Sequence, residues 1–148
     1  MDTVATEPVN VLIADDDKAV ATTLSYIIRH LGYSADVVDD GGPALERIQR
    51  SPAYYQLLIT DHAMQKMDGL ELVEKLKLLH YPGKILVLSA YLDRKTEASY
   101  RFFGVENLMD KPFDPAVLRN KVKELIAQQA TRSSPGPAGI FPPVLTTS

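Results

Sequence analysis

Five polar side chains in this sequence stand at the ends of short apolar segments. The segments read VNVLIADD, LLITD, ILVLS and NLMDK, and the polar residues are Asp15, Asp16, Asp61, Ser89 and Lys111. Clustered carboxylates offer the hard oxygen ligands that Mg²⁺ prefers. A carboxylate can also attack phosphorus, and the phosphoryl group that it then carries needs cations and donors to balance its oxygens. These residue types point to Mg²⁺-assisted phosphoryl chemistry, provided that the fold brings them together.

Each of these residues also has a simpler structural explanation when it is taken alone. Asp15 and Asp16 could be surplus helix caps, and Asp61 could be a turn residue. A loop hydroxyl and a lysine beside a proline are common surface features. Three acids left unpaired at one edge would, however, repel one another. A divalent cation removes that repulsion, so the combination favours a functional site.

The apolar pattern predicts the elements that would position these residues. Short β-branched segments indicate strands, and apolar residues three or four apart indicate helices. Asp17 is expected to cap the first helix, and Gly32 to follow its end. The expected strands are 9–14, 33–38, 56–60, 84–88 and 107–110, and the expected helices are 20–31, 43–50, 70–79, 94–103 and 114–129.

Strands that alternate with helices predict an α/β fold with a doubly wound, five-stranded parallel sheet and five helices. The strands are apolar throughout rather than at alternate positions, which is typical of strands covered on both faces. In such sheets, ligands bind at the carboxyl ends of the strands. The polar residues follow those ends, so we expect them to meet at one edge.

Charge and composition exclude several other kinds of protein. The 148 residues contain no cysteine, which excludes disulfides and thiol chemistry. The net charge of -3 provides no basic face for nucleic acid, and no apolar run approaches the ~20 residues of a membrane span. The N-terminus lacks the apolar centre of a secretory signal. We therefore predict a cytoplasmic protein that binds neither nucleic acid nor membrane.

The chain is expected to form one domain with a tail at each end. Residues 1–8 would be the N-terminal tail, 9–129 the folded domain, and 130–148 a flexible tail rich in proline, serine and glycine. The segment GIFPPVL in the second tail could instead be a docking peptide, although flexibility is the simpler interpretation. The tail has no room for an output domain, so we expect the domain to act alone.

Four segments, in order, resemble the receiver domain of two-component response regulators, the CheY-like family. They read VLIADDDKAV, LITDHAMQKMDGLEL, VLVLSA and DKPF, and the resemblance covers about 9–129. It implies a flavodoxin-like sheet with strand order 2-1-3-4-5. It also implies that Asp61 accepts a phosphoryl group from a phosphohistidine on a sensor histidine kinase or phosphotransfer protein. An unknown downstream protein would then respond.

The resemblance also implies roles for the other residues of the cluster. The ligands of Mg²⁺ would be three carboxylates and one backbone carbonyl, those of Asp15, Asp16, Asp61 and Ala63. The Ser89 hydroxyl would swing toward the phosphoryl group, and Lys111 would pair with it. The bond between Lys111 and Pro112 would be cis, an isomer found chiefly before proline.

The chain departs from the family pattern at several positions. Gln65 stands where the family commonly has proline, and Leu108 where it usually has an aromatic residue that rotates with the hydroxyl. We therefore predict a quieter switch, or one that runs through Tyr91 or the nearby helix. One or two aromatic residues of that helix are expected in the core. An exposed one would serve a partner or a phosphorylation-dependent dimer; the three are Tyr100, Phe102 and Phe103.

Two other functions remain open on the sequence. A haloacid dehalogenase-type phosphatase would use Asp15 with Asp17, but Ala19 stands where that family has Thr or Val. A receiver-like binding module would keep the fold without being phosphorylated. The histidines show no metal-ligand spacing, and His62 is expected beside the entrance to the site. We expect a phosphoacceptor switch that catalyses only its own phosphorylation and dephosphorylation.

Overall fold

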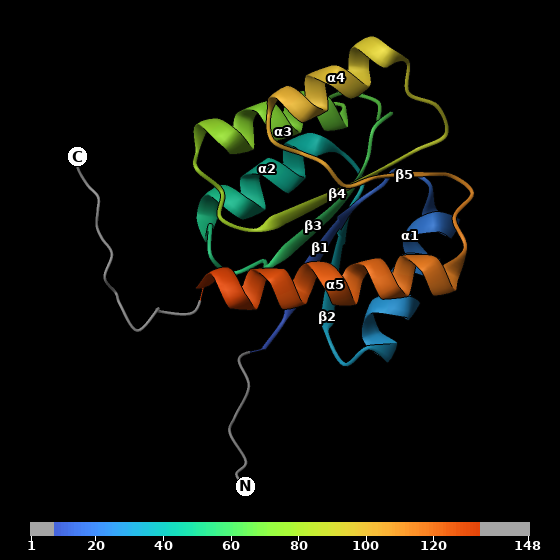
Figure 1. Ribbon diagram of the computed structural model, residues 1–148, viewed down its shortest axis with the longest axis vertical. Coiled ribbons are helices and arrows are strands. Elements are labelled where there is room, and N and C mark those ends of the chain that lie inside the picture. Colours follow the sequence, from blue (N-terminus) through green and yellow to red (C-terminus); the bar gives the residue numbers. More distant parts are fainter. Residues whose placement is uncertain (1–7, 134–148) are drawn as a thin grey trace, which may run out of the picture.

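The computed structural model describes residues 8–133, and its elements alternate as the sequence predicts (Figure 1). Most of the two predicted tails lies outside these residues. The strands are β1 (Asn10–Ala14), β2 (Ser34–Val38), β3 (Leu57–Asp61), β4 (Lys84–Ser89) and β5 (Leu108–Asp110). The helices are α1 (Lys18–His30), α2 (Gly41–Arg50), α3 (Gly69–Leu78), α4 (Arg94–Phe102) and α5 (Pro115–Ser133).

Helix α5 is longer than the sequence pattern predicts. It continues to Ser133, so residues 130–133, which were expected to begin the flexible tail, are helical. The apolar period lapses after Ile126, but the next helix-breaking residue is Pro135. Although α5 has 19 residues, no helix within 8–133 is long and apolar enough to cross a membrane.

The five strands form one parallel sheet in the order β2-β1-β3-β4-β5, which confirms the predicted fold. β3 lies at the centre, and its five residues are all buried. Ile59 pairs with Ile13 on one side and with Leu86 on the other. The central strand therefore carries Asp61 out of the most protected part of the sheet.

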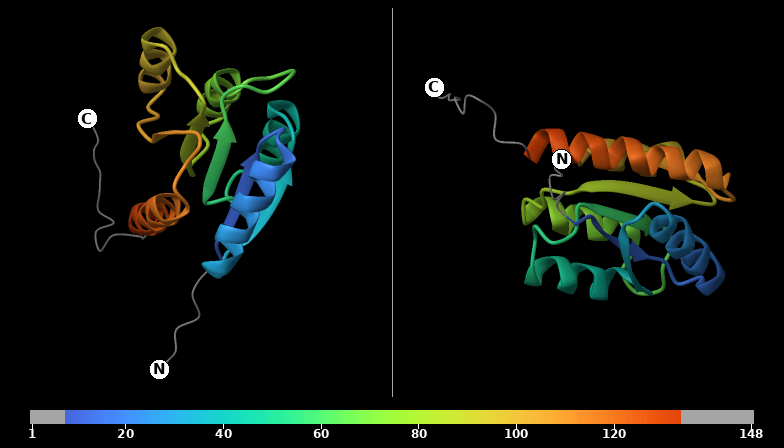
Figure 2. Two further views of the ribbon diagram at one scale, coloured as in Figure 1. Left: turned by 90° about the vertical axis from the view of Figure 1, so that its right-hand side faces the viewer. Right: turned by 90° about the horizontal axis from the view of Figure 1, so that it is seen from below.

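Two apolar cores cover the faces of this sheet. Leu57 and Ile59 pack with residues of α1 and α5, whereas Leu58 packs with residues of α2, α3 and α4. Figure 2 shows the two layers, with α5 across the sheet from α2 and α3. Because successive residues of a strand point to opposite faces, the apolar residues of β3 alternate between the two cores. The continuous apolar segments of the sequence follow from this arrangement.

Aspartates begin the helices that follow the strands. The side chains of Asp17, Asp40, Asp68 and Asp93 accept backbone N–H groups in the first turns of α1, α2, α3 and α4. Such caps satisfy N–H groups that have no partner within the helix. The predicted cap at Asp17 is confirmed, and Gly32 follows α1 with a φ of 88°. The caps fix where each loop turns at the carboxyl edge of the sheet.

Candidate functional site

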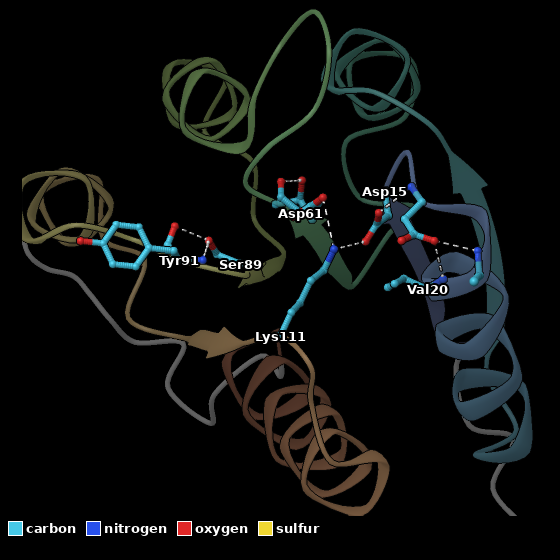
Figure 3. A network of polar contacts seen from close by, with 9 residues as sticks. Asp15, Val20, Asp61, Ser89, Tyr91 and Lys111 are labelled. Carbon is cyan, nitrogen blue, oxygen red and sulfur yellow. Dashed lines mark hydrogen bonds and ion pairs between the residues drawn. The ribbon is translucent and has the colours of Figure 1, made fainter.

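Four neighbouring strands deliver polar residues to one edge of the sheet (Figure 3). Asp15 follows β1, Asp61 and Ser89 are the last residues of β3 and β4, and Lys111 follows β5. All the strands are parallel, so their carboxyl ends share this edge. The structure thus brings together residues that lie as far apart in the sequence as Asp15 and Lys111.

Lys111 links the two buried carboxylates of this edge. Its Nζ lies 3.0 Å from Asp15 Oδ2 and 3.2 Å from Asp61 Oδ2. The exposed fractions of the side chains are 16% for Lys111, 1% for Asp15 and 9% for Asp61. Buried charges lose their hydration and need paired charges to offset that loss. The single ammonium therefore holds together two acids that would otherwise repel each other.

Three carboxylates at this edge form a group that fits a hard metal ion. Oxygen atoms of Asp15, Asp16 and Asp61 all lie within 4.8 Å of one another. Asp16 is exposed, which leaves a side of the group open to solvent. Asp15 Oδ1 accepts the backbone N–H of Asp17 at 2.9 Å, which fixes the orientation of that carboxylate. An all-oxygen, negatively charged donor set of this kind suits Mg²⁺, which keeps several of its own waters.

Burial and the neighbouring charges shift the pKa values of the paired residues. Burial, and after it the charge of Asp15, raises the pKa of Asp61, while Lys111 and the Ala63 backbone N–H act in the opposite direction. Burial acts to lower the pKa of Lys111, but Asp15 and Asp61 outweigh it, so that pKa is raised. Lys111 therefore stays charged. Keeping Asp61 ionised costs free energy in the folded protein, and a further cation would reduce that cost.

The Ser89 hydroxyl points toward Tyr91, as Figure 3 shows. Ser89 is 5% exposed; its Oγ donates to the Tyr91 carbonyl at 2.8 Å and accepts the Tyr91 N–H at 3.1 Å. Its backbone carbonyl accepts the N–H of Lys111 at 2.9 Å. The hydroxyl is thus attached to the loop after β4, and its turn toward Asp61 would require this pair of hydrogen bonds to break.

A further acid, Asp40, holds the loop between β3 and α3. It is 8% exposed, and its carboxylate accepts the backbone N–H groups of Lys66 at 3.0 Å, Met67 at 2.9 Å and Gly42 at 3.4 Å. Burial acts to raise the pKa of Asp40, but these hydrogen bonds outweigh burial and lower it. The loop that carries Gln65 in place of the family's usual proline is thereby tied to α2.

Sequence reasoning missed this role of Asp40. The signal available was the run DDGG, in which an acid precedes glycine at the start of a helical period. Gly41 allows the close contact, because a Cβ there would lie 2.7 Å from the Met67 carbonyl oxygen. The distance along the chain between Asp40 and Met67 hides this contact from any local pattern.

Replacing Asp40 with alanine is expected to lower the free energy of unfolding by about 2–4 kcal/mol, through loss of a helix cap and of charge-assisted hydrogen bonds. Because the pKa of Asp40 is lowered, its contribution is present above the ordinary value of 3.8 and is lost as the pH falls through the lowered value. Urea unfolding at several pH values measures this. Asp39→Ala, at an exposed neighbour, is the control. Equal losses in the two variants would contradict the role of Asp40.

The other residues that the sequence analysis singled out lie in different surroundings. Leu108 is half-buried, and Tyr91 is 78% exposed. Of the α4 aromatics, Tyr100 is fully buried and Phe102 is 84% exposed, so the expectation of one or two in the core is met. His62 is half-buried and contacts Tyr100. The bond before Pro112 is cis, as the resemblance implies.

Comparisons with known proteins identify the family. The model of the response regulator receiver domain matches residues 11–123. Transcriptional regulatory protein ZraR of Klebsiella oxytoca is 28% identical over 129 residues, and alkaline phosphatase synthesis transcriptional regulatory protein PhoP of Bacillus subtilis is 27% identical over 116. These matches cover 87% and 78% of this chain but only 29% and 48% of the two relatives. The chain thus spans less than half the length of either protein.

Solved structures agree with this family. A CheY-like response regulator receiver domain protein from Methanospirillum hungatei has a TM-score of 0.80 at 25% identity, covering 86% of this chain and 100% of that one. A putative response regulator from Chloroflexus aurantiacus has a TM-score of 0.73 at 30% identity, covering 82% and 99%. Members of this family act as phosphoacceptor switches that work with sensor histidine kinases. The architecture, the acid cluster and the sequence match lead to one conclusion: this chain belongs to the response regulator receiver domain family.

Proposed function

We propose that this receiver accepts a phosphoryl group on Asp61 and acts as a phosphorylation-dependent protein-binding switch or relay. One observation carries the proposal. The Asp61 carboxylate ends the central strand within 3.2 Å of the Lys111 ammonium and within a group of acids that fits Mg²⁺. A carboxylate with a fixed cation beside it can act as a nucleophile toward phosphorus. The charge that develops on the phosphoryl oxygens would find its compensation already in place.

The transfer would use the residues of the carboxyl edge in distinct roles. An oxygen of Asp61 forms the new bond to phosphorus, while the bond from phosphorus to the imidazole nitrogen of the donor breaks and its electron pair stays on that nitrogen. Mg²⁺, held by Asp15, Asp16, Asp61 and the Ala63 carbonyl, would supply positive charge that offsets the phosphoryl oxygens. Lys111 stays protonated and pairs with one of those oxygens.

The phosphoryl group then changes the balance of charge at this edge. It adds about -1.5 to -2 charges and several acceptor oxygens beside Ser89 and Lys111. Ser89 gains a stronger acceptor than the Tyr91 carbonyl, so its hydroxyl turns and releases the loop after β4. This biases two arrangements of a loop and helix rather than the sheet itself.

The partners follow from this chemistry. A phosphohistidine on a sensor histidine kinase or a phosphotransfer protein would be the donor, and a downstream protein or a second copy of this chain would read the altered face. Action in the cytoplasm, without nucleic acid or membrane contact, is part of the proposal. Action without an attached output domain stays a prediction, because the curated relatives are longer than their matched receiver segments.

The proposal is tested by locating the phosphate. The protein is incubated with Mg²⁺ and acetyl phosphate, the acyl phosphate is reduced with borohydride, and the modified aspartate is found by peptide mass spectrometry. We expect the modification at Asp61. Modification at Asp15 would favour the phosphatase alternative. An unmodified protein that also fails to bind Mg²⁺ at millimolar concentration would favour the binding module that is never phosphorylated.

A further inference from the structure

The buried aromatic side chain of Tyr100, on helix α4, contacts the loop that follows the candidate phosphoacceptor. Tyr100 is 0% exposed, and its hydroxyl oxygen lies 2.6 Å from Nδ1 of His62, the residue after Asp61. The two rings meet edge to face with their centroids 5.6 Å apart. A buried hydroxyl keeps its partner because leaving it without one is costly. This hydrogen bond therefore joins the last turn of α4 to the residue that follows β3.

The backbone around this hydrogen bond is packed without spare room. A Cβ at Gly69 would lie 2.6 Å from the Asp61 carbonyl oxygen and 2.7 Å from the Tyr100 hydroxyl oxygen. The Gly69 N–H also donates to the His62 carbonyl at 2.8 Å. Close-packed groups transmit displacement because they have no void to absorb it. A shift of the backbone at Asp61 and His62 would therefore press on Tyr100.

The charge of the candidate phosphoacceptor already acts on Tyr100. Burial, and after it the charges of Asp68 and Asp61, raises the pKa of Tyr100. The hydroxyl therefore keeps its proton. Additional negative charge at Asp61 would act on the same group in the same direction.

Leu108 and Tyr100 meet in one apolar cluster beside the site. Leu108 stands where the family usually has an aromatic residue, and it packs against the apolar cluster that includes Tyr100. A leucine there has no hydroxyl and no ring to follow the motion of Ser89. Tyr100 fills the same cluster from α4 and reaches the phosphoacceptor loop directly.

We propose that the hydrogen bond between Tyr100 and His62 couples phosphorylation of Asp61 to the position of α4. The inference rests on the proposed phosphorylation and adds its route of transmission. Tyr100 acts as a positioning residue: it touches His62 and reports the state of the loop to the helix that bears the exposed Phe102. Because such coupling is reciprocal for binding, a partner bound to α4 would also change the affinity of the site for the phosphoryl mimic beryllofluoride.

The test measures the response of α4 in the full chain. Backbone amide NMR spectra are recorded with Mg²⁺, before and after addition of beryllofluoride, for the parent and for Tyr100→Phe, which keeps the ring. In the parent we expect shifts both near Asp61 and along α4. In Tyr100→Phe, we expect the shifts near Asp61 to persist and those along α4 to be lost.

A matched variant controls for the loss of a buried hydroxyl. Tyr81 is 5% exposed, belongs to the same core cluster, and donates to the Tyr55 carbonyl at 2.7 Å. Tyr81→Phe should leave the α4 response as in the parent. The double mutant Tyr100→Phe with His62→Ala should lose no more of the α4 response than Tyr100→Phe alone. The two substitutions remove the same hydrogen bond, so their effects should not add.

The possible outcomes test the coupling separately from the proposed phosphorylation of Asp61. An unchanged α4 response in Tyr100→Phe would overturn the coupling and leave the phosphorylation of Asp61 intact. Losses that add up in the double mutant would also overturn it, since Tyr100 would then act independently of His62. A parent protein with no shift near Asp61 would refute the proposed phosphorylation, and the coupling with it.

Discussion

Asp61→Asn is expected to incorporate no phosphate from acetyl phosphate or from a phosphorylated phosphotransfer protein, at Mg²⁺ concentrations that label the parent. Asparagine has nearly the same shape as aspartate, so the fold is kept. The amide of asparagine has no negative oxygen to attack phosphorus. Loss of the Asp61 carboxylate also weakens the acid group that fits Mg²⁺. Intact-protein mass spectrometry measures the phosphorylated fraction directly.

Asp68→Asn is the matched control for this substitution. Asp68 lies in the same loop and caps α3 by accepting the N–H of Glu71 at 2.9 Å. Asparagine caps a helix about as well as aspartate, so labelling and stability should stay at parental levels. Labelling of Asp61→Asn at the parental rate would show that another residue is the acceptor.

Asp61→Asn should also have a higher free energy of unfolding than the parent at neutral pH. Burial, and after it the charge of Asp15, raises the pKa of Asp61, so the folded protein binds this proton more tightly than the unfolded chain does. The stability that protonated Asp61 provides is present below the ordinary value of 3.8 and is lost as the pH rises through the raised value. Asparagine avoids that loss. Millimolar Mg²⁺ should narrow the difference, because it stabilises the parent by binding the folded state.

Lys111→Met is expected to slow phosphorylation of Asp61 by about a hundredfold to a thousandfold, the usual effect of removing one group that stabilises charge in a transition state. The ammonium lies between Asp15 and Asp61, so it is in place before the phosphoryl group arrives. Methionine keeps an unbranched stem of similar length but carries no charge. Rates of labelling by acetyl phosphate at saturating Mg²⁺ measure the effect.

Lys121→Met controls for the loss of a positive charge elsewhere on the surface. Lys121 pairs with Glu124 at 3.3 Å on α5 and does not pair with the acid group. Its substitution should leave the rate of labelling unchanged. Mg²⁺ binding offers a second measurement: it should tighten in Lys111→Met, because the two carboxylates lose a competing cation. Parental labelling in Lys111→Met would remove Lys111 from the proposed mechanism.

Sequence patterns predicted those parts of the molecule that depend on local chemistry. The ends of β1, β3 and β4 follow from apolar segments that stop at Asp15, Asp61 and Ser89, and parallel strands bring such ends to one edge. The order of the strands came from the resemblance, and the sheet confirms it. What remained hidden depends on contacts between distant segments or on the rotation of a single side chain.

Three features show why they remained hidden. The carboxylate of Asp40 bonds to backbone atoms 26 and 27 positions away, and Tyr100 meets His62 across 38 positions. Neither contact leaves a periodic signal, because each depends on single residues rather than on a repeating set. The direction of the Ser89 hydroxyl depends on a rotation about one bond, which residue type alone does not determine.

The length of the strand that ends in Asp61 determines where its carboxylate lies. Leu57 and Ile59 face one core and Leu58 the other, so a shift of β3 by a single residue would exchange its two faces. It would also carry the carboxylate forward by about 3.3 Å, the rise of one strand residue. That step is as long as the whole distance of 3.2 Å between Asp61 and Lys111. The length of the segment from Leu57 to Asp61 therefore sets the contact between Asp61 and Lys111.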